Sequence, residues 1–433
     1  MKTGAVFVDL TAAYDTVWHR GLLVKLSRCM PMWFVETIEM FLRDRRFRVH
    51  MGDKVSRWRT QRSGLPQGSV LSPTLFNLYI NDMPETTSHK FIYADDICCA
   101  AQAKTFTELE TTLSSDMRKL TEYFKLWRLV PSMTKTVTSV FHLHNASATV
   151  TLNIDFDGHS LKHDPHPCYL GVTLDRALTL KEHLSKTALK IKSRNNLLQK
   201  LAGTTWGADA VTLRLTAVAL CYSVGEYCAP VWCRSNHTHL VDVQLNNTMR
   251  TVSGTIRSTP IEWLPVLSNI APSHLRRESI TKNLLHHVIE NPSLPLCDIL
   301  QNPPSHRLAS RRPVWKSPPL NDFSVEERWR HEWDSAEVVN KHLVDDPTKP
   351  VAGMDLKRGN WCKLNRFRTN CGVCAASQHK WGTRPNPYCA CGQKQTMSHI
   401  AEDCSLTKFE RGVAGLNVVD ADAVLWLDKL RIR

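Results

Sequence analysis

The stretch Phe91-Ile92-Tyr93-Ala94-Asp95-Asp96-Ile97-Cys98-Cys99 places two adjacent carboxylates between two short runs of apolar, strand-forming residues. Such runs on either side of a polar pair predict a β-hairpin with the aspartates at its tight turn. Two like charges this close repel each other unless a cation neutralises them, and carboxylate oxygens are the ligands that Mg²⁺ prefers. The stretch therefore indicates a Mg²⁺ site, although an ordinary solvated acidic turn explains it equally well when it is taken alone.

A second apolar strand near the N-terminus also ends in an aspartate. Ala5-Val6-Phe7-Val8 is followed by Asp9, and Asp15 lies six residues further on, at the expected start of a helix. If Asp9 meets Asp95 and Asp96 at adjacent strand ends, the three carboxylates form the set that holds two Mg²⁺ ions in phosphoryl transfer, one at the attacking oxygen and one at the leaving group. The acids thus predict a two-metal site.

The composition favours a polyanionic partner. The 433 residues contain 55 Lys and Arg against 41 Asp and Glu, a net charge of +14 with a pI near 9.2. A basic surface of this size binds phosphates by releasing their counterions, although many basic proteins have no such partner. No run approaches the roughly 18 consecutive apolar residues of a membrane span. The 14 cysteines lie mostly in apolar segments, as reduced thiols do, so we expect an intracellular chain with no membrane partner.

Periodicity and turn residues predict the remaining elements. The loop Ser63-Gly64-Leu65-Pro66-Gln67-Gly68 has two glycines and a proline, which make a turn that another group can approach closely. Helices are expected over 16–27, 32–43, 70–81, 109–127, 213–231 and 240–252, hairpins over 46–61 and 150–163, and a buried strand over 168–175. Prolines are dense from 291 to 319 and Arg307–Arg312 is basic, which predicts a linker or mobile segment.

One predicted helix carries a basic face. From 176 to 200 there are seven basic residues and one acid. Lys186, Lys190 and Arg194 recur at i, i+4 and i+8 on one side of this helix. An apolar side is predicted opposite them, formed by Leu184, Ile191 and Leu198. The pattern suits contact with phosphates, and a solvated basic face explains it nearly as well.

Cysteines gather near the C-terminus, with five in residues 371–404. Cys389, Cys391, His399 and Cys404 offer three thiolates and one imidazole, a complete tetrahedral set for structural Zn²⁺. Reduced core thiols are the alternative interpretation, and Cys371 and Cys374 form a competing or second half-site. Basic and aromatic residues beside the cluster suit a nucleic-acid-binding tail, namely Lys380, Trp381 and Arg384.

Four segments together carry a resemblance to a known family. Val8–Asp15, Ser63–Ser69, Tyr93–Asp96 and Tyr169–Val172 occur in the order of the palm motifs of reverse transcriptases. The chain resembles the polymerase of a non-LTR (LINE-type) retrotransposon of the jockey group, over the palm and thumb and on to the C-terminus. The resemblance implies an α+β fold, in which an antiparallel palm sheet with helices packed on one face precedes a helical thumb and a small Cys/His zinc-type region. The corresponding ranges are 1–175 for the palm without fingers, 176–290 for the thumb or connection, 291–350 for a Pro-rich linker region and 351–433 for the C-terminal region.

The same resemblance implies RNA-directed DNA polymerase activity. Asp9, Asp95 and Asp96 would hold two Mg²⁺ ions that join a primer 3′-hydroxyl to the α-phosphate of a dNTP and release pyrophosphate. The implied partners are an RNA template, a DNA primer, their RNA–DNA heteroduplex and other protein encoded by the element. The cytoplasm and the nucleus are the implied compartments.

Further residues take roles by their place in the family's motifs. Tyr14 matches the aromatic gate against a ribose 2′-hydroxyl. Lys135 matches a lysine that neutralises pyrophosphate, although Lys135 also fits an ordinary surface lysine. Beside it, Ser132-Met133 stands where relatives carry Asn-Pro. Gln67 matches the glutamine that touches the incoming nucleotide. The other implied contacts are Gly64, Pro66 and Gly68 beside the nucleotide and template, Gly171 in a primer grip, and Lys186, Lys190 and Arg194 along the heteroduplex.

The N-terminus departs from the family's pattern. Only eight residues precede Asp9, whereas the family places its fingers, and jockey-type elements an endonuclease, before this motif. The chain therefore resembles a 5′-truncated copy. A catalytically inactive remnant that binds nucleic acid is the alternative function, and a maturase-like splicing factor is a third and weaker one.

Overall fold

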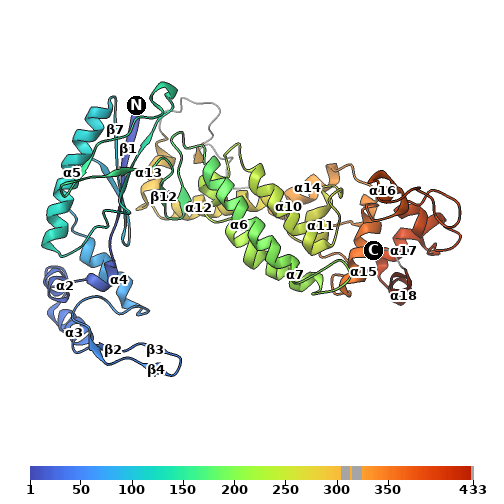
Figure 1. Cartoon of the computed structure of the whole chain (residues 1–433), viewed down its shortest axis with the longest axis horizontal. Helices are drawn as coiled ribbons and strands as arrows, with labels where there is room; N and C mark the ends of the chain where they lie inside the picture. The colour runs from blue at the N-terminus through green and yellow to red at the C-terminus, as the bar shows by residue number, and fades with distance from the viewer. Residues whose placement is uncertain (304–312, 315–323, 431–433) are drawn as a thin grey trace. The chain divides into compact units, whose positions relative to one another are not determined.

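The computed structural model describes residues 1–303, 313–314 and 324–430. The described residues form two compact units, residues 1–182 and residues 183–433 (Figure 1). The basic stretch Arg307–Arg312 and most of the proline-dense segment lie outside the described residues. The four predicted domain ranges stay predictions.

A five-stranded sheet organises the first unit (Figure 1). Its strands are β1 (Lys2–Asp9), β6 (His89–Tyr93), β7 (Asp96–Ala103), β8 (Val137–Phe141) and β11 (Lys162–His163), in the order β11-β8-β1-β7-β6. The neighbouring strands are antiparallel, as predicted, except that β11 runs parallel to β8 at the edge. Together with the helices, this sheet makes the unit an α+β fold.

The long helix α5 (Phe106–Leu126) packs on β1 and β7. It begins at a capping box, in which Thr105 accepts from the Glu108 backbone N–H and the Glu108 carboxylate accepts in return. Its buried side chains recur at helical spacing, as predicted, and include Leu109, Leu113, Met117, Leu120 and Phe124. These side chains and the facing strand residues make one hydrophobic core.

Four shorter helices complete the first unit: α1 (Ala13–Thr16), α2 (His19–Leu26), α3 (Met32–Leu42) and α4 (Leu71–Ile80). The helix predicted over 16–27 is confirmed as α2, but its predicted start is wrong, because the chain leaves helical geometry at Val17 (ψ 122°). The helix resumes at His19. Buried Lys25 joins α2 to its neighbours, since its ammonium lies 3.8 Å from the centre of the Trp127 ring and donates to the Tyr123 hydroxyl at 2.8 Å.

Two further hairpins are confirmed. The first consists of β2 (Arg46–Phe47), β3 (His50–Met51), β4 (Lys54–Val55) and β5 (Arg59–Thr60), with the turn at Gly52-Asp53. In the second, β9 (Asp155–Phe156) pairs with β10 (His159–Ser160). Asp157 and Gly158 both have positive φ, 53° and 79°, the geometry for which an Asp-Gly turn is selected.

The continuous buried strand predicted over 168–175 is wrong. Residues Cys168–Tyr169 (β12) and Val172–Thr173 (β13) form a tight antiparallel hairpin. Leu170 and Gly171 stand at its turn with φ of 46° and 76°, and two consecutive left-handed residues reverse a strand. Tyr169 packs on Phe7, with ring centres 5.8 Å apart, so this hairpin covers the sheet face opposite α5.

The second unit is helical within its described residues (Figure 1). It begins in α6 (Lys181–Gln199). The single helix predicted over 213–231 is wrong, because the chain is broken at two places. A π-helical segment follows α7 (Ala210–Ala217), and Cys228 takes a left-handed conformation (φ 52°). Its other elements are α7 (Ala210–Ala217), α8 (Ser223–Gly225), α9 (Ala229–Trp232), α10 (His239–Ser253), α11 (Trp263–Ser268), α12 (Ser273–Glu290), α13 (Pro295–Gln301), α14 (Val325–Ser335), α15 (Arg358–Arg368), α16 (Ala375–Lys380), α17 (Gly412–Val418) and α18 (Ala421–Lys429). Among the described helices, none has the length and apolar character that crossing a bilayer requires.

Aromatic and charged side chains are buried in this unit. Trp263 on α11 meets Trp333 on α14, with ring centres 5.0 Å apart. Arg368 on α15 is fully buried and donates to the Asn417 and Asn365 side chains at 2.7 and 3.0 Å. Burial lowers the pKa of Arg368 to about 9.

Candidate active site and candidate metal centre

Three aspartates lie at one end of the central sheet. Asp9 is the last residue of β1 and Asp96 the first of β7, and the two are direct cross-strand partners. Tyr93 on β6 pairs with Asp96 from the other side, and Asp95 follows Ala94 (φ 52°) in the turn between these strands. The predicted hairpin is confirmed, and the antiparallel register places the Asp9 and Asp96 side chains within about 5 Å at Cβ.

The electrostatics of this sheet end suit a cation. Burial, and then the charges of Asp95 and Asp9, raise the pKa of Asp96. The Asp9 side chain is 35% exposed, yet its Oδ2 atom is buried and accepts no hydrogen bond from the described residues. Among the described residues only the exposed Lys135 ammonium, 3.4 Å away, faces this oxygen, and a bound divalent cation would satisfy it more fully. The residue types therefore suit Mg²⁺, but Asp9, Asp95 and Asp96 do not form a converged group of three ligand atoms, and the one such group among the described residues is the Cys/His cluster of the second unit.

Lys135 stands beside Asp9 and was not expected there from the spacing alone. Its Nζ lies 3.4 Å from Asp9 Oδ2, although the side chain is 71% exposed. The loop that carries it is fixed to the end of β1, because the Ser132 N–H donates to the Asp9 carbonyl at 2.7 Å and the Asp9 N–H donates to the Thr136 hydroxyl at 3.3 Å. An exposed cation thus lies at the carboxylates.

The loop Ser63–Gly68 is attached to α1. The Gly64 N–H donates to the Val17 carbonyl at 2.8 Å, and the Leu65 N–H donates to the Tyr14 carbonyl at 2.7 Å. The Gln67 side-chain amide donates to Asp15 Oδ1 at 3.0 Å, a contact that gives Asp15 a positioning role that the sequence did not reveal. The two motifs, far apart in the sequence, therefore form one surface.

Tyr14 occupies the same surface. Its ring stacks on Phe76 of α4, with centres 4.6 Å apart and planes inclined by 19°. Burial, followed by the charges of Asp95 and Tyr93, raises the pKa of the Tyr14 hydroxyl, which is therefore neutral near pH 7. The Tyr14 ring is thus held against α4 close to Asp95, and its role as an aromatic gate stays a prediction.

Replacing Gly64 by alanine should destabilise the first unit by roughly 2–4 kcal/mol. Gly64 has φ of 85°, and an added Cβ would lie 2.5 Å from the Asp15 carbonyl oxygen. Gly68→Ala is the matched control, because Gly68 has nearly the same φ, 84°, with open space around it. It should cost only about 1–2 kcal/mol. Urea unfolding measures the stability of both variants. Equal losses of stability would contradict the argument that the added Cβ at position 64 collides with the Asp15 carbonyl oxygen.

The remaining predicted contact residues are exposed, except for Pro66. Gly171 is at the exposed turn between β12 and β13, while Pro66 is buried. Lys186, Lys190 and Arg194 are exposed on α6. On the opposite side of this helix Leu184, Ile191 and Leu198 are fully buried, so the predicted amphipathic pattern is confirmed. Their contacts with nucleic acid stay predictions.

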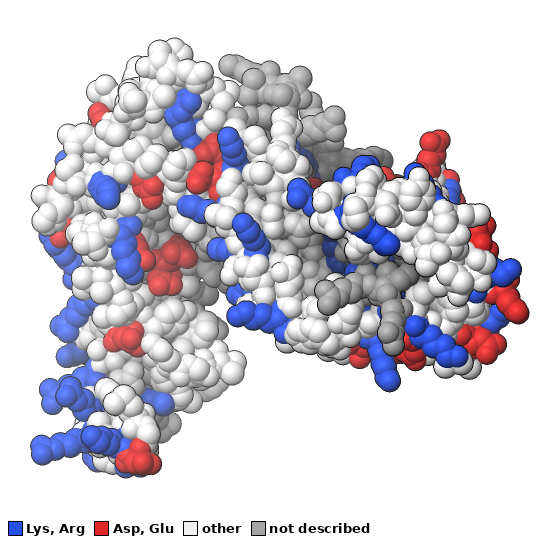
Figure 2. Space-filling view, turned by 45° about the vertical axis from the view of Figure 1, so that its right-hand side comes forward, with Lys and Arg blue, Asp and Glu red and all other residues white. Residues whose placement is uncertain are grey.

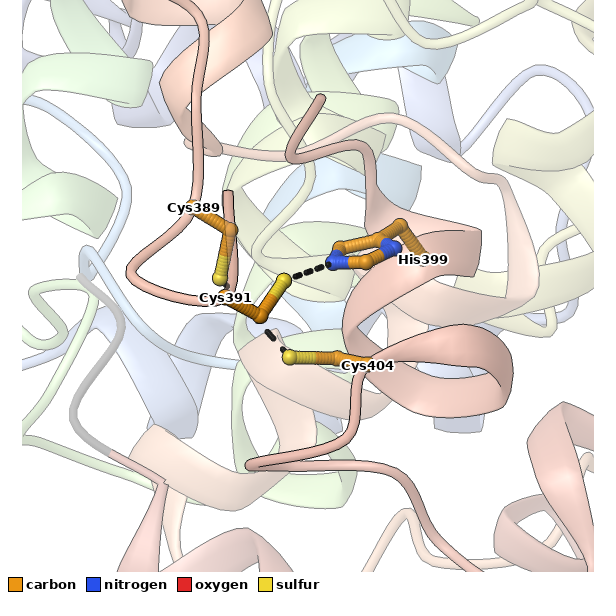
Figure 3. A group of neighbouring side chains, drawn as sticks. All are labelled: Cys389, Cys391, His399 and Cys404. Atoms are coloured by element: carbon orange, nitrogen blue, oxygen red, sulfur yellow. Dashed lines mark hydrogen bonds between the residues drawn. The ribbon is translucent and has the colours of Figure 1, made fainter. Parts of the chain in front are cut away.

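The C-terminal cluster brings its four predicted ligands together (Figure 3). The ligand atoms of Cys389, Cys391, His399 and Cys404 all lie within 4.8 Å of one another, the one such group of three or more found among the described residues. Cys391 Sγ is 3.2 Å from His399 Nε2, and the Cys389 and Cys404 sulfurs are 3.7 Å apart. Three sulfurs and one ring nitrogen converging on one point fit a tetrahedral Zn²⁺.

Local backbone geometry builds this centre. Gly392 (φ 88°) turns the chain after Cys391, and its N–H donates to the Cys389 carbonyl at 2.9 Å. Burial alone would raise the pKa of Cys404, but hydrogen bonds from Thr407 and from the Leu406 backbone outweigh this and lower it to about 6. A lowered pKa favours the thiolate, which is the form that binds metal.

Cys371 and Cys374 lie outside this group. Cys371 Sγ is 3.8 Å from the Ser258 carbonyl oxygen, and buried Cys374 is 3.2 Å from the Ser377 hydroxyl. Cys374 also belongs to the apolar core of this region. The four-ligand set is therefore complete without them.

In the comparison with known proteins, the match to a protein family covers nearly the whole first unit. Residues 1–174 match the family described as reverse transcriptase (RNA-dependent DNA polymerase). The chain is 31% identical over 275 residues to a probable RNA-directed DNA polymerase from transposon BS of Drosophila melanogaster, which covers 58% of this chain and 29% of the relative. It is 26% identical over 302 residues to the RNA-directed DNA polymerase from mobile element jockey of the same species, covering 64% and 32%.

A third relative extends over more of the chain. The Pol polyprotein of a type-1 retrotransposable element R1 from Nasonia vitripennis, named as retrovirus-related, is 21% identical over 370 residues, 82% of this chain and 88% of the relative. The first 174 residues thus form a reverse transcriptase domain. More particularly, the resemblance to jockey-like, non-LTR reverse transcriptases is confirmed. The chain spans about a third of the length of the first two relatives.

Proposed function

We propose that this chain is an RNA-directed DNA polymerase of a non-LTR retrotransposon, which adds dNTPs to a primer 3′-hydroxyl. The observation that carries the proposal is the cross-strand pair Asp9–Asp96 with Asp95 in the adjoining turn, where the Lys135 ammonium, 3.4 Å from one buried oxygen of Asp9, is the only cation that pairs with Asp9 among the described residues. Carboxylates at this spacing repel one another and are retained where they hold divalent cations.

The protein's own residues would position the reactants. Two Mg²⁺ ions held by Asp9, Asp95 and Asp96 would activate the 3′-hydroxyl and stabilise the leaving pyrophosphate. Lys135, which is exposed and lies 3.4 Å from Asp9 Oδ2, would then neutralise that pyrophosphate. Gln67, oriented by Asp15, would contact the incoming dNTP.

Other residues would guide the nucleic acids. Gly64, Pro66 and Gly68 shape the loop that would border the nucleotide and the template. The exposed turn at Gly171 would let the primer backbone approach closely, since glycine presents no side chain. Lys186, Lys190 and Arg194 would follow the phosphates of the RNA–DNA heteroduplex without reading its sequence.

Tyr14→Ala should reduce discrimination against ribonucleotides by roughly 100-fold, because the ring that stacks on Phe76 would no longer block a 2′-hydroxyl. Tyr14→Phe is the control, since it keeps the ring and should keep the discrimination. Single-nucleotide addition of dTTP and UTP measures the ratio of kcat/KM values. An unchanged ratio in Tyr14→Ala would show that another group forms the gate.

The C-terminal region would be stabilised by structural Zn²⁺ bound to Cys389, Cys391, His399 and Cys404. We propose that other protein encoded by the element is a further partner, and that the chain acts in the cytoplasm and the nucleus.

Primer extension on a poly(rA)/oligo(dT) template with Mg²⁺ tests the proposed activity. Mg²⁺-dependent incorporation of dTTP is the expected result. Salt-sensitive binding of the heteroduplex with no incorporation would overturn the proposal in favour of a nucleic-acid-binding protein without turnover.

A further inference from the structure

Residues 43–62, which we call the basic hairpin, have no role in the proposed site. These 20 residues contain eight Lys or Arg and two Asp, a net charge of +6 out of +14 for the whole chain. Figure 2 shows basic residues gathered at the lower end of the first unit, where Figure 1 places β2 to β4. The hairpin therefore carries a large part of the chain's positive charge in a small segment.

The basic hairpin is open on both faces. Its strands pair only with each other, β2 with β5 and β3 with β4. Every residue from 46 to 60 is exposed. A two-stranded ribbon without a third strand or a covering helix is marginally stable in water, so these side chains are available to a partner.

Most of its cations have no acidic partner. Arg43 pairs with Glu39 at 2.9 Å, and the Arg45 guanidinium lies over the Phe41 ring. No carboxylate among the described residues pairs with the others, namely Arg46, Arg48, Lys54, Arg57, Arg59 and Arg62. Cations held this close without counter-charges raise the local potential, which a polyanion relieves.

Aromatic rings lie among these cations. Trp58 is 59% exposed, and the Arg48 guanidinium lies 4.7 Å from the centre of its ring. A cation on one face of an indole holds the ring in place, and the other face remains free for a planar group. Arg46 lies on β2 and His50 on β3, and Arg48 lies in the short segment between these two strands.

We propose that the basic hairpin binds single-stranded RNA, with Arg46 and Arg48 at phosphates and a base stacked on Trp58. The proposal rests on the proposed function, in which the RNA is the template strand. Clustered cations and an exposed aromatic ring form the surface that holds unpaired strands, whereas bases stacked inside a duplex offer Trp58 no open face.

The connection to the site supports this assignment. The two ends of the hairpin are tied where the Gln61 N–H donates to the Arg45 carbonyl at 2.8 Å. The next residues, Ser63–Gly68, form the loop that is bonded to α1 beside Asp15. An RNA strand bound to the basic hairpin would therefore lie on the segment of the chain that leads directly into the proposed nucleotide site.

Binding of labelled oligo(rA), followed by fluorescence anisotropy without dNTP, tests the proposal apart from catalysis. Trp58→Ala should weaken binding about 5- to 100-fold. Arg46→Gln/Arg48→Gln should lower the slope of log K against log salt by about 1.4. Trp33→Ala, an equally exposed tryptophan on α3 (67%), and Arg118→Gln on α5 should leave binding unchanged.

The outcomes separate this inference from the polymerase proposal. If the affinity of Trp58→Ala for oligo(rA) stays within twofold of that of the unsubstituted chain, the RNA-binding role of the basic hairpin is overturned. This holds even where Asp95→Asn abolishes primer extension. An equal loss on a blunt RNA–DNA duplex overturns the assignment to single strands. Trp58-dependent binding of oligo(rA) in a chain that never extends a primer supports the hairpin and contradicts only the proposed activity.

Discussion

Asp95→Asn is expected to lower primer extension by at least about 1,000-fold, because the carboxylate that would hold Mg²⁺ is replaced by a neutral amide of the same shape. Asp95 lies in the turn between β6 and β7, next to the pair Asp9–Asp96. Removing one negative charge from this cluster also relieves repulsion, so the folded state should be as stable as before or more so. Rates of dTTP addition and urea unfolding measure the two effects.

Asp157→Asn is the matched control for this substitution. Asp157 also stands at a hairpin turn in the same unit, with φ of 53°, a conformation that asparagine tolerates. It pairs with Lys125 at 2.6 Å on the exposed surface, a contact worth at most about 1 kcal/mol. Its extension rate should stay within twofold of the original. An Asp95→Asn chain that extends primers equally fast would contradict the metal assignment.

Cys404→Ser is expected to remove bound zinc and to destabilise the C-terminal region by several kcal/mol, since metal binding contributes directly to folding. Cys404 is the one fully buried thiol among the four ligands, so its replacement should destabilise the region more than replacement of half-buried Cys389 or Cys391. Zinc content by mass spectrometry under native conditions, and thermal unfolding before and after chelation, measure the effect. One zinc per chain is expected before substitution and close to none after it.

Cys371→Ser serves as the control for this experiment, because Cys371 lies near the four ligands in sequence but outside their group. It should retain zinc and its unfolding temperature. Zinc retained in Cys404→Ser and lost in Cys371→Ser would reverse the assignment of ligands. Chelation without any effect on unfolding would favour reduced core thiols instead.

Local patterns were sufficient for much of the fold. The apolar runs around Asp95-Asp96 specified a hairpin, and the spacing of Leu109 to Phe124 specified the buried face of α5, because each depends on neighbours in the sequence. The Cys/His spacing likewise identified four residues whose ligand atoms lie together. The roles of the predicted site residues stay predictions.

Local patterns failed where backbone conformation at single residues decided the path. Tyr169–Val172 is apolar enough for a buried strand, yet Leu170 and Gly171 both take positive φ and reverse it. A leucine in this conformation is unfavourable by itself and is held there by packing, such as that of Tyr169 on Phe7. The helix expected over 16–27 begins only at His19, because Val17 is extended (ψ 122°) and its carbonyl accepts from the Gly64 N–H.

The sequence by itself determined the α+β class, the two acidic strand ends, the basic face of α6 and the Cys/His set, since residue type and periodicity are properties of neighbours along the chain. Only the tertiary structure decided that Asp9 opposes Asp96, that Lys135 lies beside them and that Asp15 orients Gln67. These contacts join residues between 52 and 126 positions apart. Strand register and loop packing bring such residues together, and no local pattern encodes either.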